Sequence, residues 1–379
     1  MTHLESRIVQ HMPFFFFNLQ RWLHLIWNRQ GWSGWLGWLA LLPFSWGFAL
    51  VVHVRNRLYD RRWLAVEQAP LSVISVGNLT VGGTGKTPFV LWLARALQAQ
   101  GKSVGILSRG YKGTQTHAAV VVGINGEALA TPEAVGDEPV MLARLFPGVV
   151  IASQDRLAGA RLARERFGLE LMILDDGFQH RRLSREVDIL LLSGSNSMHN
   201  QRLLPAGPFR EPVSAARRAH ILIATKGDPL DDAPSPWQQH ATALRKPLYT
   251  AHLEAVALVS IEQHQWREIP LTELSGKRIM ALSGIADPLP FYRALQEWDA
   301  EVTEVMECPD HHQYVQADWQ AISFAGQKVE MIVTTEKDLV KLERFPFATR
   351  KLVALRTRLA IPQEAALLAT LTQHLTRTE

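Results

Sequence analysis

The chain has 379 residues, of which 47% are apolar and 20% charged, a balance typical of a globular protein, and it carries a net charge of +4. This length favours two ordinary domains over one large one. A single cysteine, Cys308, excludes an internal disulfide and suits a reducing compartment. The pI of about 9.3 suggests an anionic partner, which could be a nucleic acid, a membrane surface or a phosphorylated substrate.

An uncharged segment covers residues 31–52, and seven of the twelve tryptophans precede residue 64. At about 1.5 Å per residue this segment could cross a hydrocarbon core of roughly 30 Å. A cleaved signal peptide fits poorly, because the segment is too long and lacks a small-residue cleavage site. Pro43 and four glycines weaken a straight spanning helix, which leaves a re-entrant or an interfacial helix open. A buried helix of a soluble domain is the other alternative. Membrane attachment is the favoured interpretation, with the arginines that follow on the cytoplasmic side, namely Arg55, Arg57, Arg61 and Arg62.

Beyond this segment, apolar strand-like runs alternate with helical stretches, which predicts an α/β fold with a mostly parallel sheet, like that of P-loop NTPases. We expect an N-terminal membrane anchor over 1–63, a P-loop domain over 64–228 and a second, smaller α/β domain over 229–379. A surface linker is expected at 228–237. The strand-like runs lie at 71–76, 103–108, 119–123, 149–153, 171–176, 188–193, 221–226, 279–284, 331–338 and 351–356.

The stretch VGNLTVGGTGKTP, residues 76–88, follows the first expected strand and opens the first expected helix. The phosphate-loop pattern G-x-x-x-x-G-K-[ST] fits at Gly85, Lys86 and Thr87, but Thr80 stands where the first glycine belongs. In this context, backbone N–H groups and the helix N-terminus would bind phosphate. Lys86 would add a positive charge, and Thr87 would offer its hydroxyl to Mg²⁺.

Two carboxylates follow an apolar run in LDDGFQH, residues 174–180. Because ligands of open α/β sheets bind at the C-terminal ends of strands, Asp175 and Asp176 could hold Mg²⁺ directly or through water. A solvated turn is the alternative, and the phosphate loop upstream favours the metal.

Three further stretches stay ambiguous. In VGDEP, Asp137 and Glu138 could serve catalysis or simply suit the start of a helix. In CPDHHQY, residues 308–314, one cysteine and adjacent histidines give poor zinc geometry, which leaves an active-site histidine bound to a carboxylate or a surface turn. In ATKGD, residues 224–228, a weak match to the guanine-reading element of GTPases occurs.

Together and in this order, the motifs resemble those of the tetraacyldisaccharide 4′-kinase family of lipid A biosynthesis. The resemblance extends from Val76 to Leu342, and LDDGFQH together with LLPAGPFREP is highly specific. The family's phosphate loop also has displaced glycines, which accounts for Thr80. The motifs that carry the resemblance are VGNLTVGGTGKTP, SRGYKG, VGDEP, LDDGFQHRRL, LLPAGPFREP, PDHHQY and TTEKDLVKL.

The resemblance implies transfer of the ATP γ-phosphate to the 4′-hydroxyl of tetraacyldisaccharide 1-phosphate, with Mg²⁺, at the cytoplasmic face of the inner membrane. It implies Asp137 as general base and His311 as its orienting partner, in an interdomain cleft. Most of the acceleration should come from positioning and charge neutralisation by Lys86, Thr87 and Mg²⁺. The implied nucleotide-binding residues are Gly82, Gly83, Thr84, Gly85, Lys86, Thr87 and Arg210; the implied metal-side residues are Thr87, Asp175, Asp176 and Glu211; and Arg109, Tyr111, Gln179 and His180 are implied for the disaccharide and its 1-phosphate.

A substrate with four acyl chains favours a kinase at the bilayer, where basic residues attract anionic lipid headgroups at about 1 kcal/mol each. No zinc-finger or RNA-binding signature is present, so no nucleic-acid partner is expected. No protein partner is predicted either. One rival is a membrane-attached GTPase switch of the metallochaperone or targeting type, which predicts tighter binding of GTP than of ATP. Another is a lipid-binding scaffold with a vestigial loop, in which Lys86→Ala would have no consequence.

Overall fold

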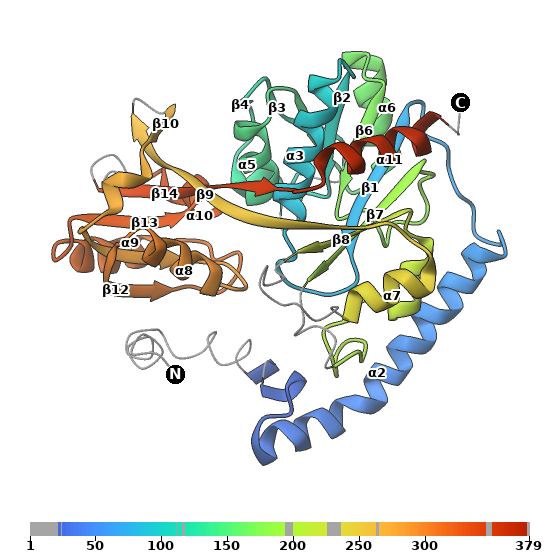
Figure 1. Ribbon diagram of the computed structural model, residues 1–379, viewed down its shortest axis with the longest axis horizontal. Coiled ribbons are helices and arrows are strands. Elements are labelled where there is room, and N and C mark those ends of the chain that lie inside the picture. Colours follow the sequence, from blue (N-terminus) through green and yellow to red (C-terminus); the bar gives the residue numbers. More distant parts are fainter. Residues whose placement is uncertain are drawn as a thin grey trace. The chain divides into compact units, whose positions relative to one another are not determined.

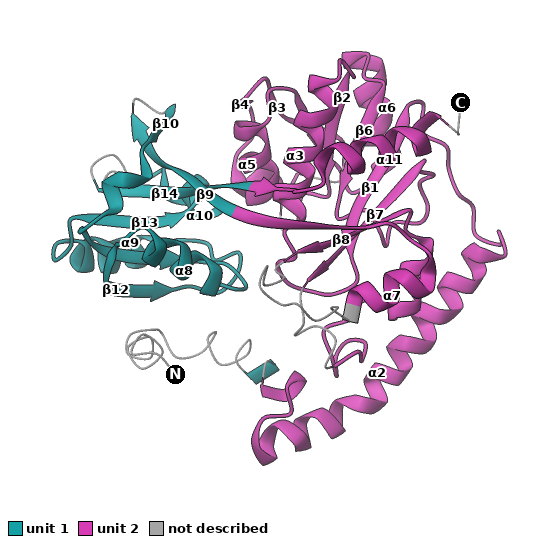
Figure 2. Cartoon of the chain, in the orientation of Figure 1, with its two compact units in different colours: residues 1–23, 254–358 teal, residues 24–253, 359–379 magenta. Residues whose placement is uncertain are grey.

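The computed structural model describes residues 22–23, 25–111, 113–115, 118–193, 200–225, 236–262, 265–345 and 351–376. The chain forms two compact units (Figure 2): unit 1 comprises residues 1–23 and 254–358, and unit 2 comprises residues 24–253 and 359–379. The division differs from the expected boundary at 228/229, because strands β9 (Leu248–Glu262) and β14 (Leu352–Ala360) each begin in one unit and end in the other. The guanine-reading candidate at 226–228 and most of the expected linker lie outside the described residues.

Unit 2 is built on a mostly parallel sheet, with β9 followed by β8-β7-β1-β6-β2-β5-β3-β4 (Figure 1). Neighbours from β9 to β5 pair in parallel, whereas β3 pairs antiparallel with both β5 and β4. Because β1, β6 and β2 are parallel neighbours, their C-terminal ends meet at one edge of the sheet. The strands are β1 (Ser72–Asn78), β2 (Val104–Ser108), β3 (Val120–Ile124), β4 (Glu127–Ala128), β5 (Val149–Ala152), β6 (Leu171–Asp175), β7 (Val187–Ser193) and β8 (Ile221–Thr225).

Helices cover both faces of this sheet. Helix α3 (Lys86–Ala99) buries Phe89, Val90, Leu93, Ala94 and Leu97, the spacing of an apolar helical face. Right-handed crossovers put α3 on one face and α6 (Arg156–Phe167) on the other, and α5 (Asp137–Leu145) packs beside α3. The remaining helices of unit 2 are α4 (Pro132–Val135), η2 (Val213–Arg218), α7 (Pro236–Leu244), α11 (Glu364–Thr376) and the long α2 described next.

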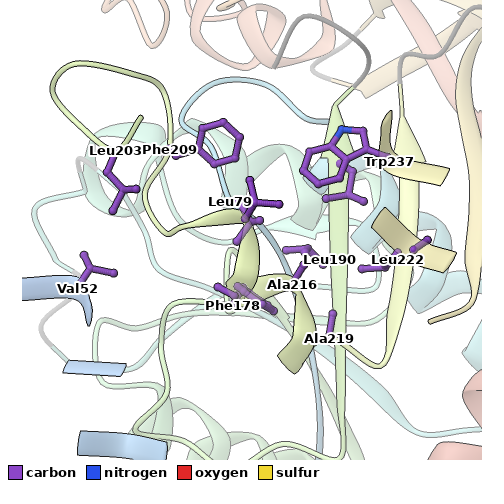
Figure 3. Close-up of a cluster of buried hydrophobic side chains, with 14 residues drawn as sticks. Val52, Leu79, Phe178, Leu190, Leu203, Phe209, Ala216, Ala219, Leu222 and Trp237 are labelled. Carbon is purple, nitrogen blue, oxygen red and sulfur yellow. The ribbon is translucent and has the colours of Figure 1, made fainter. Parts of the chain in front are cut away.

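Helix α2 (Gly31–Asp60) is a single 30-residue helix that contains Pro43, and it is long and apolar enough to cross a membrane. Only 17% of the apolar 18-residue stretch of α2 is buried inside the protein, so α2 is not the buried core helix of a soluble domain. Its Val52 nevertheless packs into a core cluster with Leu79 and Phe178 (Figure 3). The Ser45 hydroxyl also donates to the carbonyl oxygen of Leu203 at 2.7 Å. The helix is therefore docked on the rest of unit 2, while most of its apolar surface stays exposed.

Unit 1 holds strands in the order β12-β11-β13-β14-β9, with β10 antiparallel to β9. The expected run at 331–338 is a strand only to Thr335, because the Thr335 side chain accepts from the Asp338 N–H and caps α10 (Glu336–Leu342). Strands β9, β10 and β12 are not among the expected strands. The other elements of unit 1 are β10 (Gln265–Ile269), η3 (Leu271–Leu274), β11 (Arg278–Ser283), α8 (Leu289–Glu297), β12 (Glu301–Glu307), α9 (Gln316–Gly326) and β13 (Met331–Thr335).

Candidate active site

The predicted phosphate loop connects β1 to α3. Gly82 and Gly85 have φ values of 99° and 76°, which favour glycine over residues with a side chain. A Cβ built at Gly82 or at Gly83 would meet no atom within 4 Å, so the loop borders open space rather than packed protein. Thr80 departs from the pattern for a structural reason. It is buried, pairs with Phe209 in an isolated bridge and accepts from Arg210 Nε at 3.2 Å through its carbonyl oxygen.

Asn78, at the end of β1, holds this loop to two other segments. Its Nδ2 donates to Thr84 Oγ1 at 2.8 Å, and its Oδ1 accepts from the Arg210 guanidinium. Its carbonyl oxygen accepts from Gln179 Nε2 at 2.8 Å. Asn78 is fully buried and is absent from the residues expected at the site. Its position in VGNLT, at the tip of a predicted strand, is the signal that could have identified it.

Asp176 is the anionic partner of the loop's lysine. Its Oδ1 lies 3.6 Å from Lys86 Nζ, and its two oxygens accept from the two terminal nitrogens of Arg210 at 2.9 Å each. Burial opposes ionisation of Asp176, but the charges of Lys86 and Arg210 outweigh it and hold the pKa of this carboxyl well below its usual range. Asp176 therefore stays ionised and clamps both cations beside the phosphate loop.

Asp175 has the opposite environment. Its side chain is buried, and its Oδ1 has no hydrogen-bond partner among the described residues. Burial, together with the charges of Glu138 and Asp176, raises its pKa to about 7 against the influence of Lys86 and Arg156. A buried carboxylate oxygen without a donor, at a strand tip beside a phosphate loop, suits a hard cation such as Mg²⁺. Of the two aspartates, Asp175 is the one that fits a metal ligand.

Arg156 lies beneath these carboxylates and was not expected there. Its guanidinium donates to the carbonyl oxygens of Leu107 at 3.1 Å and Asp175 at 2.9 Å, and so joins the C-terminal ends of β2 and β6. Arg156 is 1% exposed, and burial lowers its pKa to about 10. An arginine in the first turn of an amphipathic helix gives no sequence signal for such a role. Glu138, whose charge acts on Asp175, is the other contributor absent from the expected site.

Asp137 is the first residue of α5, after Gly136 as the N-cap, and it is 3% exposed. A Cβ at Gly136, where φ is 92°, would lie 2.5 Å from the Tyr111 carbonyl oxygen. The Gln115 N–H donates to the Ala134 carbonyl oxygen at 2.9 Å across the same contact. These contacts fix the start of α5 against the loop that follows β2. Asp137 is thus a buried carboxylate at the edge of the sheet that carries the phosphate loop, rather than a solvated capping residue.

The residues expected to bind the disaccharide differ in exposure. Arg109 and Tyr111, in the loop after β2, are exposed, with Tyr111 at 58%. Gln179 is half-buried, and its Oε1 has no hydrogen-bond partner among the described residues. His180 is half-buried, and burial together with the charges of Arg156 and other nearby arginines lowers its pKa to about 4.

Glu211 does not have the surroundings expected of a metal ligand. Its oxygens accept from Arg218 at 2.8 and 3.1 Å and from Asn56 Nδ2 at 2.7 Å. Arg55 Nη2 lies 3.3 Å from Glu211 Oε1. Burial opposes ionisation, but the hydrogen bonds and charge of Arg218 lower the pKa of Glu211. This is a correction to the expectation: Glu211 anchors the end of α2 to the segment after β7, and its oxygens already have cationic partners.

His311 belongs to unit 1, in the turn between β12 and α9, with a φ of 60°. Its Nε2 lies 3.2 Å from Lys337 Nζ and 3.8 Å from Asp310 Oδ2. His312 contacts Asp318 of α9 at 2.9 Å instead. Within the ranges that the structure describes, no group of three or more His, Cys, Asp or Glu side chains is arranged to hold a metal ion. A Mg²⁺ beside Asp175 would therefore need hydroxyl, water or phosphate oxygens as well.

Comparison with known proteins adds to this geometry. A family model described as tetraacyldisaccharide-1-P 4′-kinase matches residues 37–376. A tetraacyldisaccharide 4′-kinase from Syntrophus aciditrophicus is 41% identical over 339 residues, which cover 86% of this chain and 90% of that protein. One from Aquifex aeolicus is 39% identical over 307 residues, which cover 81% and 90%. The crystal structure of LpxK from Aquifex aeolicus in complex with ATP superposes with a TM-score of 0.74 at 35% identity, over 89% of this chain and 99% of that one.

Proposed function

This chain belongs to the tetraacyldisaccharide-1-P 4′-kinase family, as its motifs predict, and we propose that it transfers the γ-phosphate of ATP to the 4′-hydroxyl of a tetraacyldisaccharide 1-phosphate. The product is the bis-phosphorylated precursor of lipid A. The observation that carries the proposal is the phosphate loop whose Lys86 and Arg210 share the Asp176 carboxylate. The GTPase alternative is not favoured, because a switch has no need of LLPAGPFREP, the segment that supplies Arg210 to this loop.

The residues of unit 2 act mainly by positioning and charge neutralisation. The backbone of residues 82–85 and the N-terminus of α3 bind the ATP phosphates. Lys86 and Arg210, which Asp176 keeps in place, neutralise the charge on the phosphoryl group. Asp175 and the Thr87 hydroxyl would hold Mg²⁺, which would supply positive charge to neutralise the phosphate groups.

Asp137 serves as the general base for the 4′-hydroxyl, and His311 orients it. A carboxylate that accepts the hydroxyl proton must lie within hydrogen-bond reach of the acceptor. The burial of Asp137 at the start of α5 supports this role. Arg109 and Tyr111, which are exposed beside α5, bind the disaccharide and its 1-phosphate together with Gln179 and His180.

The enzyme works at the cytoplasmic face of the inner membrane, where α2 lies in the interface. Contacts with the rest of unit 2 occur along the helix: Ser45 donates to the Leu203 carbonyl oxygen, and Asn56 donates to Glu211. A spanning orientation that placed residues 31–52 in the hydrocarbon would also submerge the exposed, charged Arg202 beside Trp38 of α2, and a charged side chain at that depth is costly. The exposed face of α2 carries bulky apolar side chains suited to the lipid, among them Trp32, Phe44, Trp46 and Leu50.

The test is transfer of labelled γ-phosphate from ATP to tetraacyldisaccharide 1-phosphate in detergent micelles. Wild type and Lys102→Met should label the lipid, whereas Lys86→Met should not. Lys102 is an exposed lysine just beyond the other end of α3, so this pair controls for loss of a charge near that helix. Label released only as free phosphate, with GTP used better than ATP, would replace the kinase with the GTPase switch. Unchanged transfer by Lys86→Met would remove the loop from catalysis.

A further inference from the structure

We infer that Lys337 is a positioning residue that fixes the orientation and the tautomer of the His311 imidazole. The inference rests on the proposed role of His311, and its geometry lies entirely within unit 1. Lys337 Nζ lies 3.2 Å from His311 Nε2 and 3.1 Å from Asp310 Oδ1. One ammonium group therefore contacts both residues of the Asp-His pair in PDHHQY.

The chemistry of these groups assigns the proton on the ring. A lysine ammonium has three donors and no acceptor, and here it is paired with the Asp310 carboxylate. His311 Nε2 must accordingly accept the hydrogen bond, so the ring hydrogen is on Nδ1. In that tautomer His311 presents an Nδ1–H donor, which is what a partner that orients a carboxylate base requires.

The fold holds Lys337 where this contact needs it. Lys337 is the second residue of α10, whose N-cap Thr335 accepts from the Asp338 N–H. Asp338 is fully buried, and its carboxylate accepts from the Gly284 N–H at 2.8 Å and lies 2.9 Å from Lys341 Nζ. The first turn of α10 is thereby tied to the tip of β11. The side chain of Lys337 is 15% exposed, as is that of His311, so water competes poorly for their contact.

The adjacent histidine, His312, has a carboxylate rather than a lysine as its partner, so the lysine contact distinguishes His311. His312 Nε2 contacts Asp318 Oδ2, which also accepts the Val315 N–H at the start of α9. That carboxylate completes a helix terminus, a purely structural arrangement. The DHH motif thus gives its two histidines different partners, a cation for the first and a carboxylate for the second. A lysine that merely stabilised the turn would need only its ion pair with Asp310.

The tautomer can be measured without any activity assay. Two-bond nitrogen–hydrogen correlation spectra of the full-length protein labelled with nitrogen-15 histidine distinguish the two neutral tautomers, and His311→Gln identifies the His311 signal. We expect the Nδ1–H tautomer in the wild type and in Lys277→Met, and a shift toward Nε2–H in Lys337→Met. Lys277 is the matched control, since its Nζ lies 3.2 Å from Glu330 in the same unit. The same tautomer in Lys337→Met and wild type would overturn the inference.

A double-mutant cycle tests the consequence for turnover. Lys337→Met should lower turnover by roughly 10- to 100-fold with little change in the KM for ATP, as expected when a catalytic group is misplaced, whereas Lys337→Arg, which keeps a donor, should lose less. On the His311→Gln background the same substitution should cost nothing further. A full additional loss there would show that Lys337 acts independently of His311. If the wild type transfers no phosphate to lipid, the proposed function fails, and the tautomer measurement alone still decides on Lys337.

Discussion

At the scale of residues, the two adjacent aspartates after β6 have opposite environments that assign them different tasks. Asp176 is paired with Lys86 and Arg210 and stays ionised, whereas Asp175 has a buried oxygen without a donor and a pKa raised to about 7. Neighbouring carboxyls whose pKa values are driven apart are typical of sites that bind charge. The site therefore carries one permanent clamp for cations and one carboxylate that is costly until a cation arrives.

The cost of ionising the buried Asp175 carboxyl destabilises the folded protein, and a substitution that removes the charge should relieve it. The folded protein keeps a proton on Asp175 up to about pH 7, whereas an aspartate carboxyl with its ordinary pKa of 3.8 loses the proton earlier, so the folded state binds more protons than the unfolded state between these pH values. The stability that the protonated Asp175 carboxyl contributes is therefore fully present in acid, and it is lost as the pH rises through that range. Without metal, Asp175→Asn should raise the free energy of unfolding by about 1–3 kcal/mol above neutrality, and by less in acid.

Thermal melts in a chelating buffer at several pH values measure this effect. Glu165→Gln, at an exposed carboxylate on α6, is the control and should change stability equally little at every pH. Transfer of phosphate to lipid should be lost in Asp175→Asn, because the proposed metal ligand is gone. A variant that is destabilised to the same extent across the pH range would show that Asp175 makes a stabilising contact instead.

Asp137 gives a second prediction at this scale. Asp137→Ala should reduce turnover by about 100- to 10,000-fold, the contribution of a general base, while ATP binding persists. Calorimetric titration with ATP measures the binding, and Glu133→Gln in the preceding α4 is the control for charge. Near-normal turnover of Asp137→Ala would remove it from the base role, and loss of ATP affinity would assign it to the nucleotide site.

At the scale of elements, the turn before α5 decides where Asp137 lies. Gly136 and Gly126 both have positive φ values, 92° and 86°. A Cβ at Gly136 would lie 2.5 Å from the Tyr111 carbonyl oxygen, whereas the nearest atom to one at Gly126 is 3.7 Å away. Both alanine variants should lose about 1–3 kcal/mol of stability through backbone strain, but only Gly136→Ala should also lower turnover, because it separates the turn from the loop after β2. Equal turnover in the two variants would refute that coupling.

Strands could be predicted from the sequence where both of their faces are buried. The runs at 71–76 and 171–176 match β1 and β6 to within two residues, because buried parallel strands are continuous apolar stretches. Strand β12 was missed because six of its seven residues are half-buried and three are glutamates. The same holds for the site: the phosphate loop and Asp175 were predicted because each lies at the end of a buried, apolar strand. Arg156 and the partners of Glu211 could not be found, because they depend on which helix side chains the fold brings beneath the sheet edge or against α2.

At the scale of the whole molecule, several of the exposed cations gather at the end of α2. The four arginines expected to face lipid divide into two groups, because Arg55 is half-buried beside Glu211 while Arg57, Arg61 and Arg62 are exposed. The exposed cations follow directly on the part of α2 that carries exposed tryptophan and phenylalanine. Apolar surface and positive charge thus adjoin on one helix, the combination that binds an anionic membrane surface.

Vesicle binding of the whole chain should then depend on these three arginines. Replacing Arg57, Arg61 and Arg62 with glutamine should weaken binding to vesicles containing anionic lipid by about 3 kcal/mol, roughly 100-fold, at about 1 kcal/mol for each charge. Lys102, Arg278 and Arg293 are exposed elsewhere, and their glutamine variants remove the same net charge as a control. Sedimentation with vesicles measures both, and rising salt should reduce the difference between the variants. Equal weakening by the two triple variants would mean that net charge, rather than the end of α2, directs the chain to the membrane surface.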